Sequence, residues 1–258
     1  MHQPKQHPLK QARVLTRPLT EIRGVGPKRA ACFAGRGVRT VLDLLFFTPV
    51  RYQDRSRFTP AHELREGEPA LVHGVVISGG EVRPGRGRRP VYRILLSVEG
   101  GIVEFVWFHF RKAHLDGWSR PGTELMAYGG VSRTGRRPCM AHPEVCVSGK
   151  GSRPHPPGIH PVYASVEGVP DRVVRSAIQE ALDRYAPRID DPVPRDMLEE
   201  RGLPSLAQAL AHTHQPPDDV SLERIQRLDT PARKRMLFDR FLLVLLALGT
   251  LRERRVRR

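Results

Sequence analysis

The sequence has few cysteines and lacks the motifs that bind metals or nucleotides. Its three cysteines, Cys32, Cys139 and Cys146, are far apart and show no CxxC spacing, which argues against a zinc site and a disulfide framework. No GxxxxGKS or GxxxxGKT loop occurs, and no Ser/His/Asp or Cys/His arrangement can be argued from the spacing. We therefore expect no metal site, no catalytic residue and no cofactor in this chain, and a reducing, cytoplasmic compartment.

Long hydrophobic runs are also absent. The longest, residues 241–248, is well short of the roughly 18 residues that a membrane span needs. The first ten residues are polar and contain no apolar stretch of the kind found in signal peptides. The sequence therefore predicts that no membrane is a partner.

Lysine is scarce, and arginine carries nearly all of the basic charge. Lys and Arg number 43 against 27 Asp and Glu, for a net charge of +16. Guanidinium groups match phosphate oxygens well, and such a basic excess is typical of nucleic-acid-binding domains. Coding bias in a GC-rich genome also favours arginine over lysine, but it does not explain the uncompensated charge. Nucleic acid is thus the first partner to consider.

Proline, glycine and charge patterns divide the chain into four parts. They are a disordered basic arm (1–17), a helical segment (18–60), a β segment (61–150), and a linker followed by a helical region (151–258). Apolar spacing and capping residues predict helices over 28–34, 41–47 after Thr40, 172–185, 205–212 and 231–251. The centre of the last helix is apolar on every side, so we expect it to be buried all round.

The β segment contains five runs of strand-forming residues. They are 70–78, 91–98, 102–110, 124–131 and 138–147, with a short helix expected near 114–119. Five short strands interrupted in this way fit an OB-fold, a partly open barrel. The predicted fold class is α+β: a five-stranded OB-fold barrel flanked by an N-terminal helix-hairpin-helix-like unit and a C-terminal helical region.

A glycine turn near the N-terminus resembles the first half of a helix-hairpin-helix. It combines Gly24 and Gly26 with a proline that suits the first turn of a helix. In that motif, backbone N–H groups of the turn approach a DNA phosphate, and Lys28 and Arg29 would add charge. The alternative is a purely structural helical hairpin, and the sequence leaves both open.

A basic loop precedes an aromatic strand within the β segment. The loop carries Arg83, Arg86, Arg88 and Arg89, and the strand carries Trp107, Phe108 and His109. Arginines supply phosphate affinity, and flat rings supply a surface for bases. Since successive strand residues point to opposite faces, we expect one of the two adjacent rings to be in the core and the other to be free to stack. The alternative for the loop is a solvated surface without a partner.

Several segments together resemble the N-terminal region of the RecG family of bacterial branched-DNA helicases. They match in order and spacing across about residues 15–255 and are Gly24–Lys28, Pro49-x-Arg51-Tyr52-x-Asp54-Arg55, Trp107–Phe110, Ala141–Glu144, Pro161-Val162-Tyr163 with Glu167–Val169, and His214-x-Pro216-Pro217. The resemblance implies an OB-fold wedge that binds at the branch point of replication forks and Holliday junctions. It also implies that Phe108 stacks on an unpaired base and that residues 83–89 form the basic wedge hairpin. Many members have Asn where this chain has His109.

In that family, a helical region leads into two RecA-like motor domains that use ATP and Mg²⁺. The sequence stops where those domains would begin, so neither cofactor is assigned to a residue here. We expect either a fragment or a free-standing wedge protein, with a motor as partner in cis or in trans. The expected function is structure-selective binding of branched DNA as the recognition part of such a helicase. The alternatives are an RNA-binding OB module and the DNA-binding subunit of a split ATPase.

Overall fold

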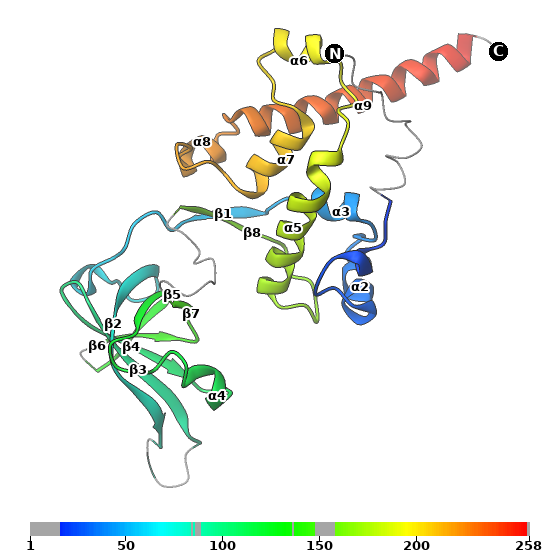
Figure 1. Cartoon of the computed structure of the whole chain (residues 1–258). Coiled ribbons are helices and arrows are strands. Elements are labelled where there is room, and N and C mark those ends of the chain that lie inside the picture. Colours follow the sequence, from blue (N-terminus) through cyan, green and yellow to red (C-terminus); the bar gives the residue numbers. More distant parts are fainter. Residues whose placement is uncertain (1–15, 84, 86–88, 136, 148–157, 257–258) are drawn as a thin grey trace, which may run out of the picture. The chain divides into compact units, whose positions relative to one another are not determined.

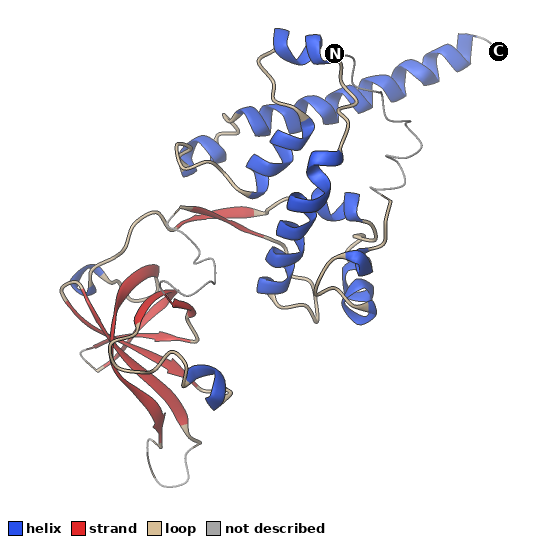
Figure 2. Ribbon diagram, viewed as in Figure 1, coloured by secondary structure: helices blue, strands red, loops and turns tan. Residues whose placement is uncertain are grey.

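The computed structural model describes residues 16–83, 85, 89–135, 137–147 and 158–256 (Figure 1). They divide into two compact units. The helical unit comprises the described residues of Met1–Gln53 and Ile159–Arg258, and the sheet unit comprises those of Asp54–Gly158. Helices predominate in the first and strands in the second, so the chain is α+β (Figure 2). The arm at 1–15 and the linker at 148–157 lie outside the described residues.

The helical unit is built mainly from short helices. Its elements are η1 (Leu19–Glu21), α2 (Pro27–Ala34), α3 (Val41–Leu45), β1 (Arg51–Asp54), β8 (Ile159–Val162), α5 (Asp171–Tyr185), η3 (Ala186–Arg188), α6 (Arg195–Glu200), α7 (Leu206–His214), α8 (Leu222–Gln226) and α9 (Pro231–Val256). Thr40 and Ser205 begin α3 and α7 with capping boxes, in which the side chain of each accepts a backbone N–H three residues on. The two strands pair with each other as a small sheet.

One hydrophobic core joins the two ends of the helical unit. It contains Phe33 and Leu44 from the N-terminal segment together with Ile178 and Leu182 of α5 and Leu210 of α7. The sequence analysis assigned these segments to separate parts of the chain, with boundaries at 60 and 151, whereas in the structure they share one core. The physical reason is that α2 and α3 are too short to bury their apolar faces against each other and need the longer α5.

The sheet unit holds a six-stranded sheet. Its elements are η2 (Ala61–Glu63), β2 (Pro69–Val82), β3 (Val91–Val98), β4 (Gly101–Trp107), α4 (Lys112–Leu115), β5 (Glu124–Thr134), β6 (Arg137–Ala141) and β7 (Glu144–Val147). The strand order is β2-β3-β4-β6-β5-β7, and β2 also pairs with β5. The pairing of β4 with β6 is parallel, and the others are antiparallel.

The run at 138–147, predicted as one strand, is two strands. The break between β6 and β7 lies at His142, whose φ of 49° is left-handed, and at Pro143, which has no N–H for a strand ladder. Left-handed backbone is uncommon for a residue other than glycine, and nothing in the local sequence except the proline indicates it. The chain can therefore change partner here, since β6 pairs with β4 and β5 but β7 pairs with β5 alone.

Alternation along β3 separates the core of the sheet unit from its outer face. Tyr92, Ile94 and Leu96 are fully buried. In the register they face Trp107, Phe105 and Val103 of β4, which belong to the same core. Residues between them must point outward, because successive strand side chains alternate. This alternation turns Arg93 and Leu95 toward the outer face.

Helix α9 is buried only near its start, which corrects the expectation of burial all round. Ala232 and Arg235 are buried, whereas the apolar run beyond them is exposed, with Phe241 at 67% and Leu243 at 68%. A helix that is apolar on every side needs packing partners all round. In this structure the described elements pack only against the first turns of α9. Over the described residues, no helix has both the length and the apolar character to cross a membrane.

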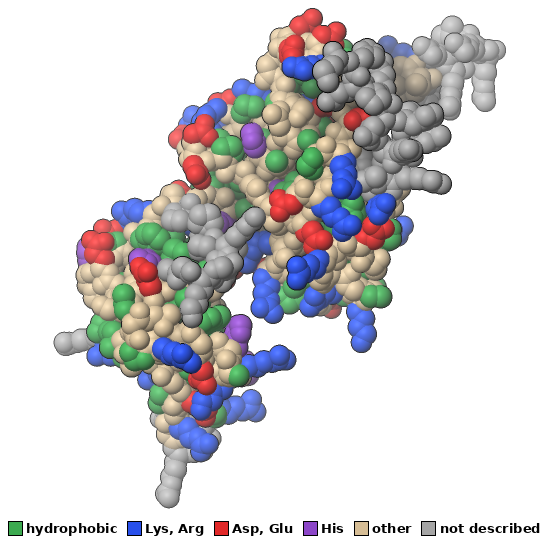
Figure 3. Space-filling view, in the orientation of Figure 1, with side chains coloured by type: hydrophobic (Ala, Val, Ile, Leu, Met, Phe, Trp, Pro, Cys, Tyr) green, Lys and Arg blue, Asp and Glu red, His purple; other side chains and the backbone are tan. Residues whose placement is uncertain are grey.

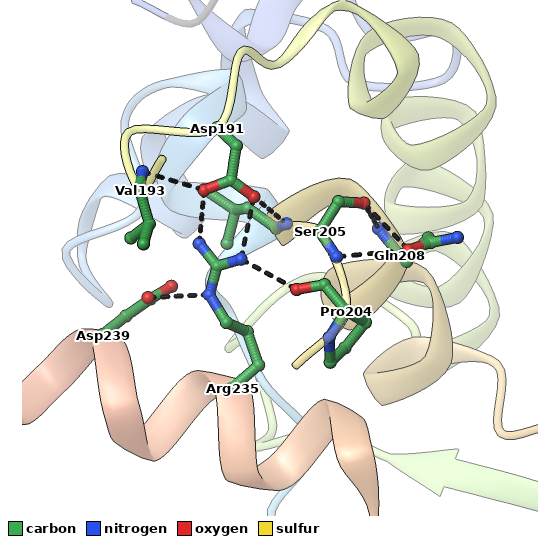
Figure 4. Close-up of polar contacts among 8 residues, drawn as sticks. Asp191, Val193, Pro204, Ser205, Gln208, Arg235 and Asp239 are labelled. Carbon is green, nitrogen blue, oxygen red and sulfur yellow. Dashed lines mark hydrogen bonds and ion pairs between the residues drawn. The ribbon is translucent and has the colours of Figure 1, made fainter. Parts of the chain in front are cut away.

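Arg235 fastens α9 to the rest of the helical unit (Figure 4). Its side chain is fully buried and donates two hydrogen bonds to the carboxylate of Asp191, at 2.6 and 2.8 Å. It also donates to Asp239 on its own helix and to the carbonyl of Pro204. Burial opposes ionisation of Asp191, but the hydrogen bonds from Arg235 and from the Leu206 and Val193 N–H groups outweigh it and lower its pKa.

A buried histidine at the end of α7 makes the helical unit sensitive to pH. His214 is 2% exposed, and its ring lies between the Tyr163 hydroxyl (2.9 Å from Nδ1) and the Leu45 carbonyl oxygen (2.8 Å from Nε2). Nε2–H donates to the carbonyl, so Nδ1 accepts from the tyrosine. Burial lowers the pKa of His214, and the bond to Leu45 opposes this only in part.

The helical unit is therefore expected to lose stability as the pH falls below 6.5, the ordinary pKa of histidine. The unfolded chain then takes up a proton that the folded His214 does not, which costs about 1 kcal/mol between pH 7.5 and 5.5. Urea unfolding followed by circular dichroism at the two pH values measures this. His214→Gln, which cannot titrate, should show the smaller loss over this range, and an equal loss would contradict the assignment.

Candidate nucleic-acid interface

The two adjacent aromatic residues at the end of β4 have opposite environments. Trp107 is only 7% exposed and packs edge-on against Phe105, with ring centroids 6.2 Å apart. Phe108 is 54% exposed. The alternation predicted one core ring and one free ring, and the structure decides which is which. Trp107 is thus a core residue and is removed from the candidate contacts.

Phe108 belongs to an exposed group of three rings, here called the ring cluster, with His142 and His109. The Phe108 and His142 centroids are 5.7 Å apart, and those of His109 and His142 are 6.4 Å apart with planes 28° from parallel. The backbone N–H of Phe108 donates to Nε2 of His142 at 3.2 Å. His109 was predicted from its neighbours, but His142 was not, because the sequence places it 34 residues away.

The basic loop lies at the same end of the sheet as the ring cluster. Val82 pairs with Val91 where β2 and β3 meet the loop, and the next residue of β3, Tyr92, pairs with Trp107. Arg83 and Arg89 are exposed, whereas Arg86 and Arg88 lie outside the described residues. On the face drawn in Figure 3, Lys and Arg side chains gather around α4 and the base of the β2–β3 hairpin.

An open groove of about 680 Å³ runs over the outer face of the sheet beside this hairpin. Its lining comes from four strands and consists of Ser78, Gly79, Gly80, Val82, Arg93, Leu95, Glu104 and Arg137. Arg93 Nε lies 3.2 Å from Glu104, whose side chain is buried, so this pair spans the floor from β3 to β4. The sequence prediction missed Arg93 and Arg137, although the apolar alternation of β3 marks Arg93 as outward-facing.

Glycine is required at one position in the wall of the groove. A Cβ on Gly79 would lie 2.5 Å from the Cβ of Ser119, which is closer than such atoms approach. The Tyr92 hydroxyl donates a hydrogen bond to the carboxylate of Asp116, just after α4, and lies 2.7 Å from Oγ of Ser119. Close packing at Gly79 therefore holds the segment that carries α4 against β2.

The glycine turn lies in the helical unit. Gly24 has a φ of 84°, which favours glycine, and Gly26 immediately precedes α2. Arg29 donates to the carbonyl of Gly24 at 2.6 Å, so its guanidinium braces the turn, while Lys28 is exposed. The turn follows a single 3₁₀ turn, η1, rather than a long first helix. Phosphate contact there stays a prediction.

Two residues of the segment 49–55, which resembles the RecG family, make contacts within the fold. Tyr52 donates to the carbonyl of Thr213 at 2.7 Å. Arg55, only 5% exposed, lies 3.5 Å above the ring of Tyr128 and pairs with Glu144 at 2.9 Å. Among the described residues, no group of three His, Cys, Asp or Glu is arranged to hold a metal ion.

Comparison with known proteins gives a consistent result. The family model of the RecG wedge domain matches residues 18–184. ATP-dependent DNA helicase RecG of Pasteurella multocida is 31% identical over 241 residues, covering 91% of this chain and 33% of the relative. Its counterpart in Escherichia coli K12 is 30% identical over 227 residues, covering 87% and 32%. This chain thus spans about a third of the length of these curated relatives.

A solved structure, described as RecG bound to a three-way DNA junction, shares the fold. It superimposes with a TM-score of 0.76 at 21% identity and covers 98% of this chain and 32% of that one. The matched family model covers both the glycine turn and the whole sheet unit with its ring cluster and basic hairpin. The chain therefore belongs to the RecG wedge domain family.

Proposed function

We propose that this chain binds branched DNA, such as replication forks and Holliday junctions, as the recognition part of a RecG-like helicase. The observation that carries the proposal is the shared position of two features at one end of the sheet. Phe108, whose ring is exposed, directly follows Trp107, the last residue of β4. Trp107 pairs with Tyr92, one residue from the Val82–Val91 pair at which β2 and β3 meet the basic loop. A site with both features can grip phosphates and hold an unstacked base together.

The physical argument favours a branch over a linear duplex. A linear duplex offers phosphates to Arg83, Arg89 and Arg93, but its bases stay stacked inside the helix. A branch point exposes bases that have lost a stacking neighbour, and a free ring compensates for part of that loss. Base–aromatic stacking contributes about 1–3 kcal/mol per base. The rings would therefore supply selectivity, and the arginines would supply affinity that falls with salt.

We further propose that the sheet unit is an OB-fold. Strands β2, β3, β4, β5 and β6 would be its five strands, with α4 between the third and the fourth. The pairings β2–β3–β4–β6–β5 and the additional pairing of β5 with β2 support this assignment. The groove then takes its lining from the first, second, third and fifth strands, and it includes part of the second and third strands, whose face such folds commonly use to bind nucleic acids.

A competition gel shift tests the proposed function. Labelled fork DNA bound to the chain is challenged with unlabelled fork, four-way junction, linear duplex and structured RNA at one salt concentration. We expect fork and junction to displace the probe at least tenfold more effectively than linear duplex. Equal displacement by linear duplex would contradict structure-selective binding, and stronger displacement by RNA would favour an RNA-binding module instead.

The exposed run of α9 supports a second part of the proposal. Six of its apolar side chains are more than half exposed, namely Phe241, Leu243, Val244, Leu245, Leu246 and Leu248. An apolar patch of this kind marks a contact surface. We propose that it contacts RecA-like motor domains, in cis or in trans, which would supply ATP and Mg²⁺ chemistry. Fork-dependent ATP hydrolysis that appears only when a motor chain is added would support the split arrangement.

A further inference from the structure

We propose that His142 is a positioning residue that sets the stacking ring of Phe108. The proposal rests on the proposed function for its DNA readout, and on the structure for the geometry. His142 touches Phe108 twice, through the hydrogen bond from the Phe108 N–H to Nε2 and through the 5.7 Å ring contact. The sequence order gave no reason to connect the two residues.

The hydrogen bond specifies the tautomer of His142. A neutral imidazole carries one proton, and the nitrogen that accepts a hydrogen bond cannot be the one that bears it. Because Nε2 accepts from Phe108, the proton of the neutral ring lies on Nδ1. This arrangement holds the residue after β4 by its backbone and thereby limits the directions that the Phe108 side chain can take.

The backbone around His142 is held on both sides. Its own N–H donates to the carbonyl of Val106 at 2.8 Å, which ties the segment to β4. Pro143 is buried against Gly129, and Glu144 pairs with the buried Arg55. A left-handed φ of 49° in a residue other than glycine persists only where surrounding contacts enforce it. These contacts fix the backbone that carries the imidazole, so the His142 ring can restrict the positions open to the Phe108 side chain.

The third ring extends the same surface. The His109 ring stacks beside that of His142, with planes 28° from parallel. Its backbone follows Phe108 directly, so the hydrogen bond to His142 restrains both residues. The ring cluster would then present an unpaired nucleobase with a preformed surface rather than one ordered on binding, which lowers the entropic cost of recognition.

Two substitutions separate positioning from folding. Asparagine tolerates left-handed backbone but is too short to place an acceptor where Nε2 lies, whereas glutamine is longer and carries an acceptor. We expect His142→Asn to keep the thermal stability of the parent chain and to lose about 2- to 10-fold of the fork-over-duplex preference. His142→Gln should retain more of that preference. His114→Asn, at an exposed histidine packed on Trp118, is the matched control and should change nothing.

Nitrogen-15 spectra of the imidazole rings give a second readout that needs no DNA. At pH 7.5 the His142 signals, identified by their absence in His142→Gln, should show a protonated Nδ1 and a bare Nε2. A protonated Nε2, unchanged fork preference in His142→Asn, or a His142→Gln no better than His142→Asn would each overturn the proposal. If the parent chain shows no fork preference, the proposed function fails, and the tautomer alone then decides whether His142 holds Phe108.

Discussion

Replacing Arg235 by methionine is expected to lower the free energy of unfolding of the helical unit by about 3–5 kcal/mol. The side chain is fully buried, and its partners Asp191 and Asp239 are only 19% and 17% exposed. Methionine fills much of the volume but leaves two carboxylates without their counter-charge. The effect should be full at neutral pH and should shrink as the pH falls toward and below 3.8, the ordinary pKa of aspartate. The carboxylates of the variant are then protonated and lose their uncompensated charge, and the parent chain loses the stability of its ion pair as the pH falls through the lowered pKa of its Asp191.

The positions of the two tryptophans allow this loss to be assigned to one unit. Trp107 and Trp118 both lie in the sheet unit, so their fluorescence follows that unit, whereas circular dichroism at 222 nm mainly follows the helices. The dichroism midpoint in urea should fall and the fluorescence midpoint should stay within error. Arg240→Met, at an exposed position on the same helix, is the control and should change the free energy by less than about 0.5 kcal/mol. A loss in Arg235→Met no larger than in Arg240→Met would contradict the role given to Arg235.

Replacing Phe108 by alanine is expected to weaken binding to fork DNA by about 1–3 kcal/mol, or roughly 5- to 150-fold. The ring is 54% exposed, so its removal costs little stability and mainly removes a surface on which a base can stack. Binding to linear duplex should change far less, because phosphate contacts from the arginines do not involve the ring. Titration of fork and duplex by fluorescence anisotropy at equal salt measures both affinities.

Phe58 provides the matched control for Phe108. It is 38% exposed and belongs to the same unit, but it bridges to Leu71 near the start of β2, far along the strand from the basic hairpin. Phe58→Ala should leave the fork preference unchanged, and Phe108→Trp should retain it, since indole also stacks. If both alanine variants lost the same fork affinity, the effect would be nonspecific and Phe108 would not be the stacking residue.

Elements whose signals are local were predicted well. The strand expected at 91–98 is β3, the helix expected at 172–185 is α5, and the cap expected at Thr40 is present. Alternation and helical spacing operate over a few residues and need no knowledge of the rest of the chain. The domain boundaries were harder, because the core that joins residues 18–53 to α5 and α7 depends on contacts across more than 120 positions.

The candidate site shows the same division. Basic residues at 83–89 and the aromatic pair at 107–108 were visible in the sequence, because charge and strand alternation are local patterns. His142, Arg93 and Arg137 were missed, since they enter the site from β3 and from the ends of β6. The burial of α9 was predicted wrongly for a related reason. An apolar helix is stabilised by packing partners, but its own sequence does not show whether other segments of the chain pack against it.

The sequence by itself determined the basic character of this protein, the types of most of its elements, and the rule that only one of Trp107 and Phe108 could face solvent. Tertiary structure decided that Phe108 is the exposed ring, that its backbone N–H donates to His142, and that Arg235 pairs with Asp191, 44 residues away. The physical reason is the range of the interactions. Propensity, capping and alternation are set by neighbours in the chain, whereas burial and pairing depend on which distant segments pack together.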